Sequence, residues 1–312
     1  MSEFVAVKPI LVVGGAVGDV VLTLPKLPVS GEDIEAQPQE RQIGGCAFNV
    51  ARALRRLDVP VINGMPVGNG DWGAAIEAAM QELDLPVLLR HGQLDNGWCL
   101  ALVEPNGERT FVTVTGCEAH WNKAQLATLP LTPETVVYAN GYELVGEPGE
   151  ALRDWLTRLP FDQWRLLDPG PRVGQLGEEF FAMLSDSHTL LTLNRDEVAI
   201  LCGEGDAVSA AQRYATAHNI TLICRLDRDG AWVCDGRNEP QHVPVYPVDV
   251  VDTIGAGDAH CAGVLAGLSA GLPLVQAVDL ANRVAACVVA SRGASGAPDW
   301  QQLQQLQQRF PA

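Results

Sequence analysis

Lysine is scarce in this chain, which has only three among its 21 basic residues. They are Lys8, Lys26 and Lys123, and none of them follows a glycine. The G-x-x-x-x-G-K-[ST] phosphate loop is therefore absent, and so is the V-A-I-K strand of protein kinases. Any phosphate chemistry in this protein must use backbone amides and arginine.

An excess of positive charge is missing as well, because the formal net charge is −17. Such a balance argues against nucleic acid and against anionic membranes as partners, since both attract basic surfaces. It does not exclude a small anionic ligand, because backbone N–H groups hold phosphate without any net positive charge.

Long apolar runs and paired cysteine motifs are also lacking. No run is long enough to span a bilayer, and the N-terminal one is too short for a signal peptide. The eight cysteines include no C-x-x-C pair. We therefore expect no zinc site, but reduced, mostly buried thiols in a cytoplasmic protein.

Buried strands and helices take turns through most of the chain, which predicts an α/β fold. We expect one domain, residues 1–312, with a three-layer, doubly wound, mostly parallel sheet. Two segments break the alternation: the polar stretch 31–43, and a hairpin at about 96–115 that turns at Pro105-Asn106-Gly107. We expect them to form a small β-sheet outside the main sandwich, as a lid.

The segment DTIGAGDAHCAG, residues 252–263, changes from a β-like run to a helix near Gly255. The first turn of a helix has N–H groups without intrahelical partners, and the helix dipole is positive there. Gly255, Ala256 and Gly257 carry no bulk to keep an anion from these groups, so they suit an oxyanion or phosphate hole. Asp258 follows, either as a stabilising charge at the helix start or as an acceptor of a hydroxyl proton.

This segment resembles the signature of the ribokinase-like (PfkB) carbohydrate and nucleoside kinases. The resemblance implies a ribokinase-like fold and an ATP-dependent transfer to a hydroxyl, expected to be a hydroxymethyl group, of a sugar or nucleoside. It implies that Asp258 is the catalytic base and that the backbone of Gly255, Ala256 and Gly257 is the anion hole.

Further motifs of that family occur in order on the acceptor side. Gly44 and Gly45 with Asn49 are similar to its G-G-x-x-x-N element, which lies against the sugar ring and bonds its hydroxyls. Asp19 matches an aspartate that holds two sugar hydroxyls. Taken alone, Asn49 would be better explained as a capping residue of a glycine-started helix, and Asp19 as an ordinary turn aspartate, but the ordered match of the motifs favours the substrate roles.

The hairpin lies where the family places its lid over the sugar, so Trp98 and Arg109 become candidate substrate contacts. Cys99 and Phe111 lie on the same hairpin, and only alternate side chains can face the substrate. The alternative for each is lid core or a contact in a homodimer formed through the lid. Arg172, in DPGPR, could reach a phosphate or be a surface arginine after a turn.

On the donor side, Asn194 and Glu197 resemble the N-x-x-E motif, which orders Mg²⁺ and the triphosphate through water. Their alternative is a helix cap followed by first-turn acids. Asn282 matches the position that packs beside adenine. Asp252 resembles the position that binds a monovalent cation such as K⁺, with further carbonyls from the loop 292–297.

The nucleotide loop departs from the family's T-x-G-x-x-G pattern, because it reads from Arg225 through Asp227 to Gly230. Aspartate tolerates left-handed backbone better than most residues, so the turn can survive at Asp227. Arg225, in place of threonine, could contact phosphate as a planar donor.

Two other classes of function stay open. A non-catalytic sugar or nucleoside sensor could retain the same scaffold, but it would need a broken signature. An oxidoreductase would use VVGGAVGD for a dinucleotide, yet the G-x-G-x-x-G pattern fails there at Ala16. The motifs do not identify the sugar or nucleoside, because the discriminating contacts would lie in the lid.

Overall fold

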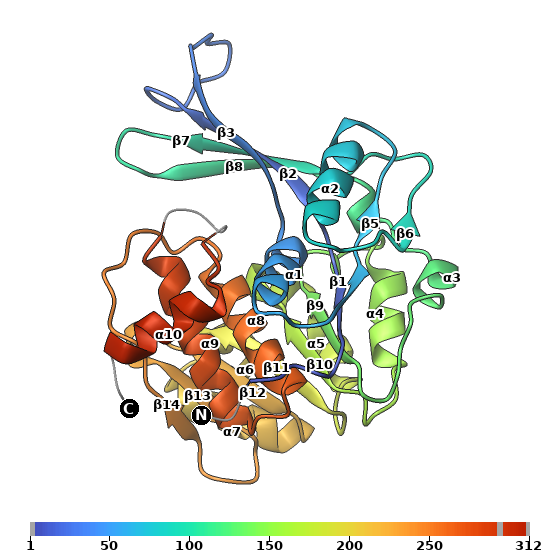
Figure 1. The fold of residues 1–312 in the computed structure, drawn as a ribbon, viewed down its shortest axis with the longest axis vertical. Helices are drawn as coiled ribbons and strands as arrows, with labels where there is room; N and C mark the ends of the chain where they lie inside the picture. Colours follow the sequence, from blue (N-terminus) through green and yellow to red (C-terminus); the bar gives the residue numbers. More distant parts are fainter. Residues whose placement is uncertain (1–3, 292–295, 310–312) are drawn as a thin grey trace.

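The structure is a computed structural model, and it describes residues 4–291 and 296–309. An eight-stranded sheet runs through its centre in the order β14-β13-β12-β11-β10-β9-β1-β4 (Figure 1). All neighbours from β4 to β12 are parallel, whereas β13 and β14 are added antiparallel. In chain order, these strands are β1 (Ile10–Val13), β4 (Val61–Gly64), β9 (Val136–Asn140), β10 (Arg165–Asp168), β11 (Thr189–Asn194), β12 (Thr221–Arg225), β13 (Ala231–Cys234) and β14 (Gln241–Val243).

Helices cover both faces of this sheet, because its strands are buried on both sides. In β1, Ile10 and Val12 enter one hydrophobic cluster, and Leu11 and Val13 enter the other. The first cluster packs against α1 (Cys46–Arg56), α2 (Asp71–Glu82), α8 (Ala256–Ser269), α9 (Leu274–Val289) and α10 (Trp300–Arg309). The second packs against α3 (Lys123–Leu126), α4 (Glu150–Thr157), α5 (Gly177–Ala182), α6 (Arg195–Cys202) and α7 (Ala207–His218). The predicted three-layer α/β class is confirmed.

A separate four-stranded sheet, the small sheet, has the order β3-β2-β7-β8 and projects beyond the end of the main sheet (Figure 1). Its strands are β2 (Val17–Thr23), β3 (Gln37–Gly44), β7 (Trp98–Val103) and β8 (Arg109–Val114). The predicted segments 31–43 and 96–115 omitted β2. Only residues 14–16 separate β1 from β2, and an apolar run that continues past glycines does not reveal that it changes sheets.

Short elements complete the chain. They are a two-stranded sheet of β5 (Pro66–Val67) and β6 (Leu89–Arg90), and three 3₁₀ turns, η1 (Cys117–Ala119), η2 (Gly170–Gln175) and η3 (Asp227–Asp229). Within the two described ranges, no helix is both long and apolar enough to cross a membrane.

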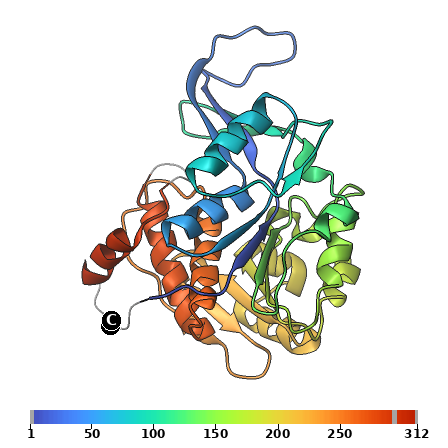
Figure 2. The same cartoon turned by 45° about the vertical axis from the view of Figure 1, so that its right-hand side comes forward.

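Helices α8 and α9 form a closely packed antiparallel pair, which holds α8 in place. A Cβ added at Gly263 would lie 2.3 Å from the Cα of Ala281, so the backbones touch where a side chain would hold them apart. Figure 2 shows α1, in blue, lying against these orange helices. The beginnings of α1 and α8 therefore meet near the carboxyl ends of the central strands.

Candidate active site

Helix α8 begins at the glycine-rich segment where the sequence predicts a helix start. Gly255 precedes the helix in the left-handed region, with φ 76°. Ala256 donates back to the carbonyl of Thr253 at 3.2 Å, which closes the turn before the helix. The amides of Gly257 and Asp258 follow in the first turn, where no intrahelical acceptor precedes them.

Asp258 is brought against α1 by a direct hydrogen bond. Asn49 Nδ2 donates to Asp258 Oδ2 at 2.8 Å, although 209 positions separate the two residues. Burial raises the pKa of Asp258 to about 6, and the charge of Asp168 adds to this, while the bond from Asn49 opposes it. A carboxylate with such a pKa is ionised at neutral pH and is a stronger base than an ordinary aspartate.

The Gly44-Gly45 pair is required by space. A Cβ at Gly44 would lie 2.0 Å from Asp19 Oδ2, and one at Gly45 would lie 2.6 Å from the carbonyl oxygen of Gly15. Gly45 also has φ 96°, which side chains rarely adopt. The predicted acceptor-side residues thus meet in one place, with Asp19 on β2, Asn49 on α1 and the two glycines between.

The two hairpin candidates fall on opposite faces of the small sheet. Asp19 is paired in register with Cys99, and Arg109 with Val103, which places these side chains on one face. Arg109 reaches the main body from that face, where its Nη2 donates to Asp252 Oδ2 at 3.3 Å. Trp98 pairs with Gly18 and belongs to the other face, so we remove it from the candidate substrate contacts.

Arg225 occupies the space in front of α8. Its Nη2 lies 3.3 Å from Asp168 Oδ1 and 3.4 Å from Glu197 Oε2, and its Nη1 lies 2.5 Å from where a Gly257 Cβ would be. Burial alone would lower the pKa of Arg225, but Asp168 and then Glu197 outweigh it and raise the pKa. A permanent cation therefore faces the start of α8, where the sequence predicts an anion hole.

Two residues of the candidate site, Asp168 and Cys46, are not marked by any of the sequence motifs. Asp168 ends β10 and opens the DPGPR stretch, so its position after a buried strand was the available signal. Cys46 begins α1 directly after the glycine pair. Burial raises the pKa of its thiol well above the usual value, and the nearby charge of Asp258 adds to that, so Cys46 is a neutral wall of the site.

Asn194 and Glu197 form a helix cap at the start of α6, which is the alternative given above to a role in ordering Mg²⁺. Asn194 Oδ1 accepts from the Glu197 backbone N–H at 2.9 Å, and Glu197 Oε2 accepts from the Asn194 backbone N–H at 2.8 Å. Burial raises the pKa of Glu197, although the bond from Asn194 opposes it. The cap still brings the Glu197 carboxylate to Arg225.

The other donor-side candidates differ in what they contact. Asp227 has φ 53°, so aspartate does adopt the left-handed turn where the family has glycine, and Gly230 follows with φ 79°. Asn282 is buried, and its Nδ2 donates to the carbonyls of Val243 and Pro244. The predicted loop 292–297 lies mostly outside the described residues.

Arg172 stacks 5.4 Å from the centre of the Tyr142 ring, beyond β10.

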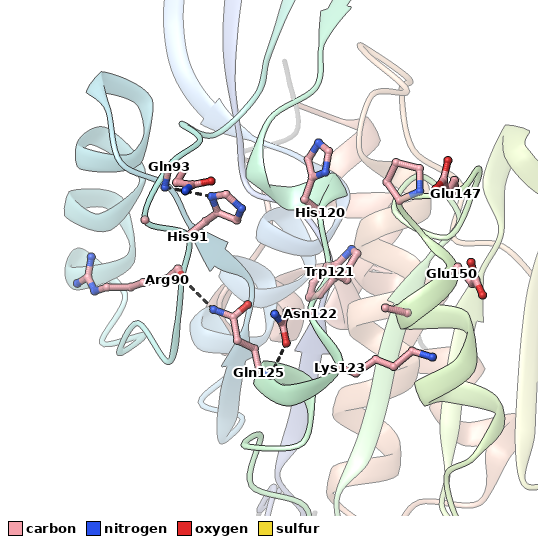
Figure 3. A pocket seen from close by; sticks show the side chains of 13 residues that line it. Arg90, His91, Gln93, His120, Trp121, Asn122, Lys123, Gln125, Glu147 and Glu150 are labelled. Carbon is pink, nitrogen blue, oxygen red and sulfur yellow. Dashed lines mark hydrogen bonds between the residues drawn. The ribbon is translucent and has the colours of Figure 1, made fainter.

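A cavity of about 910 Å³ lies elsewhere, between β6 and α4, and contains none of the predicted site residues (Figure 3). The cations Arg90 and Lys123 at its border are paired with Glu77 and Asp154. The candidate site therefore remains the region around α8, where the residues marked by the sequence lie together.

Comparisons with known proteins identify the family of this chain. The family model for pfkB family carbohydrate kinases matches residues 7–301, so the chain belongs to that family. An uncharacterised sugar kinase of Escherichia coli, YegV, is 41% identical over 316 residues, covering 97% of this chain and 95% of that protein. The ribokinase of Bacillus subtilis is 27% identical over 296 residues, or 93% and 95% of the two chains.

Solved structures show the same fold. The ribokinase of Thermotoga maritima superposes with a TM-score of 0.83 at 23% identity, covering 96% of this chain and 99% of that one. The ribokinase of Arabidopsis thaliana, solved with ribose and ATP, gives 0.82 at 20% identity, covering 96% and 98%. The fold is thus ribokinase-like, and family membership supports a sugar or nucleoside kinase.

Proposed function

We propose that this protein is an ATP-dependent kinase that phosphorylates a hydroxymethyl group of a sugar or nucleoside. The observation that supports it best is the position of Asp258. Its carboxylate lies at the start of α8, is bonded to Asn49 on the acceptor side, and has a pKa of about 6. This is where a proton acceptor for an attacking hydroxyl is needed, next to N–H groups that hold a phosphoryl group.

The remaining roles follow from the two sides of Asp258. On the acceptor side, Asp19 and Asn49 bind the hydroxyls, and the small sheet covers the substrate as a lid. On the donor side, Arg225 contacts the triphosphate, and the amides at Gly257 and Asp258 hold the developing charge. Phosphoryl transfer needs such orientation and charge stabilisation more than strong deprotonation.

The donor side also fits magnesium held mainly through water and phosphate. Oxygens of Asp168 and Glu197 bracket Arg225, and Mg²⁺ prefers oxygen ligands while it keeps several waters. No group of three or more His, Cys, Asp or Glu among the described residues forms a metal cage. When bound with ATP, Mg²⁺ neutralises the triphosphate, whereas Asn194 and Glu197 would orient its waters.

A bound monovalent cation and a homodimer also belong to this proposal. Asp252 would bind a monovalent cation such as K⁺ at the edge of the site, in exchange for its present contact with Arg109.

β8 is an edge strand whose apolar side chains Phe111, Val112 and Val114 are exposed, which supports a homodimer formed through the small sheet. Light scattering of the purified chain measures that dimer directly.

A coupled assay of ADP formation over a panel of sugars and nucleosides tests the activity. We expect one class of acceptor to raise ADP formation in the wild type, and Asp258→Asn to bind that acceptor without turning it over. Binding of an acceptor by the wild type without turnover under any condition would instead identify a non-catalytic sensor.

A further inference from the structure

Arg52 lies one turn after Asn49 on α1, and its side chain turns back toward the active site. Its Nη2 donates to Asn49 Oδ1 at 2.7 Å, and its guanidinium lies 5.5 Å from the centre of the Phe48 ring. The Nε atom is buried. Packing and one hydrogen bond therefore hold this cation in place, although a residue on α1 could have pointed to solvent.

The bond from Arg52 determines which way the Asn49 amide faces. A guanidinium has donors only, so the group that faces it must be the amide oxygen. The amide nitrogen of Asn49 is then turned to Asp258 Oδ2, to which it donates at 2.8 Å. If the amide were reversed, its oxygen would face a carboxylate oxygen, and the nitrogen would face the guanidinium. Both contacts would be repulsive.

We propose that Arg52 is a positioning residue for phosphoryl transfer, because it fixes the Asn49 amide and thereby the Asp258 carboxylate. Because Oδ2 is engaged by Asn49 and the Cys46 thiol is also bonded to the carboxylate, the carboxylate cannot rotate freely, and its remaining lone pairs face the hydroxyl proton. Asn49 still has one N–H and one oxygen lone pair for the substrate, so positioning and binding do not compete. The inference rests on the proposed role of Asp258 as the base.

The charge of Arg52 acts on the same carboxylate. Arg52 and Asp258 attract each other, so the ionised form of Asp258 is favoured over the protonated form. Other charged or titratable groups also act on Asp258. They include Cys46 from α1, Tyr138 from β9, Tyr142 just after β9, Asp168 from β10, Arg225 from β12 and Cys261 from α8 itself. Removing Arg52 leaves the repulsion from Asp168 in place and should shift the titration of Asp258 upward.

The first experiment needs no substrate. The ¹³C carboxyl signal of Asp258, assigned by its loss in Asp258→Asn, is titrated in the wild type and in Arg52→Met, which has similar length but no donors. We expect a midpoint near 6 in the wild type and roughly 0.5–1 pH unit higher in Arg52→Met. Arg52→Lys, which keeps the charge without the planar fork, should lie between them. The matched control is Arg56→Gln, an exposed arginine on the same helix, which should not move the midpoint.

The second experiment uses the acceptor found in the panel. Arg52→Met should lower kcat by about 10–100-fold with a smaller change in KM, and the acid limb of kcat/KM should move to higher pH with the carboxyl signal. Arg52→Lys should restore part of the loss. If Arg52→Met only lowers the melting temperature while the midpoint and the acid limb stay at wild-type values, Arg52 is merely structural and the inference is overturned.

The two proposals fail in different ways. A chain that never forms ADP with any acceptor refutes the proposed kinase, whatever the carboxyl titration shows. An active kinase whose Asp258 titration and kcat are unchanged in Arg52→Met refutes only the role of Arg52. If Arg52→Met does not fold, Arg52→Lys decides by the same readouts, because it retains the charge and most of the packing.

Discussion

Replacing Asp258 by asparagine should nearly abolish turnover and at the same time stabilise the folded chain. Asparagine has the same shape, and its Oδ1 can still accept the bond from Asn49 Nδ2. It cannot accept the hydroxyl proton, so turnover should fall by about 10²–10⁴-fold. The stabilisation follows from a different property of the site, the burial of a charge among groups that do not fully compensate it.

The magnitude follows from the shifted ionisation of Asp258. Its pKa is about 6 in the folded chain, against an ordinary value of 3.8. The folded chain therefore binds this proton more tightly than the unfolded chain, and stability is lost as the pH rises from about 4 to about 6. Above pH 6 the loss is complete. At 1.36 kcal/mol per pKa unit, the asparagine variant should be more stable by about 1–3 kcal/mol.

Urea unfolding of both proteins, at pH 7.5 and at the lowest pH at which both remain folded, measures this difference. The advantage of Asp258→Asn should be full at pH 7.5 and should shrink as the pH falls toward 4, where the aspartate is protonated in the folded chain and partly protonated in the unfolded chain. Asp249→Asn, a change on an exposed loop, is a suitable control and should shift neither quantity. An asparagine variant with wild-type turnover, or one less stable than the wild type at pH 7.5, would refute the reasoning.

Three further outcomes are expected. Arg225→Met leaves two buried carboxylates without their cation, so it should lower the free energy of unfolding by about 2–4 kcal/mol, measured by urea unfolding. It should also raise the KM for ATP in steady-state kinetics, and unchanged kinetics would place the triphosphate elsewhere. Gly45→Ala puts a methyl group against the carbonyl of Gly15 at a backbone φ of 96°, so it should lower the free energy of unfolding by about 1–3 kcal/mol in thermal unfolding. A variant that is as stable as the wild type and has a normal acceptor KM would contradict the close approach. Arg109→Gln removes a partly exposed ion pair with Asp252 and should change the free energy of unfolding by less than about 1 kcal/mol. It should still alter the acceptor KM to an extent that depends on salt, and an effect on KM independent of salt would argue against the ion pair.

Local sequence was sufficient where the chemistry resides in one short segment. The helix beginning near Gly255, the glycine pair before α1 and the left-handed turn at Asp227 are all found as predicted. Each depends on backbone geometry that glycine or aspartate permits and bulkier residues resist. Such preferences act between neighbours in the chain, so they can be read without knowing what lies across the molecule.

Contacts between distant segments could not be read in this way. The sequence motifs named Asn49 and Asp258 separately, but not that Arg52 holds the first and thereby orients the second. They placed Trp98 with Arg109, whereas strand register puts the two on opposite faces of the small sheet. A shift of one residue reverses every side chain of a strand, and register depends on the partner strand rather than on the strand itself.

The sequence alone determined the α/β class, the glycine-preceded start of α8 and the residues available to act there, because periodicity and backbone freedom are local properties. Only the tertiary structure decided that β2 leaves the main sheet, that Asp168 and Glu197 meet at Arg225, and that Asp258 has a pKa near 6. Charges act through space, and burial depends on everything that packs around a group. The ionisation of the proposed base is therefore a property of the folded chain rather than of its signature segment.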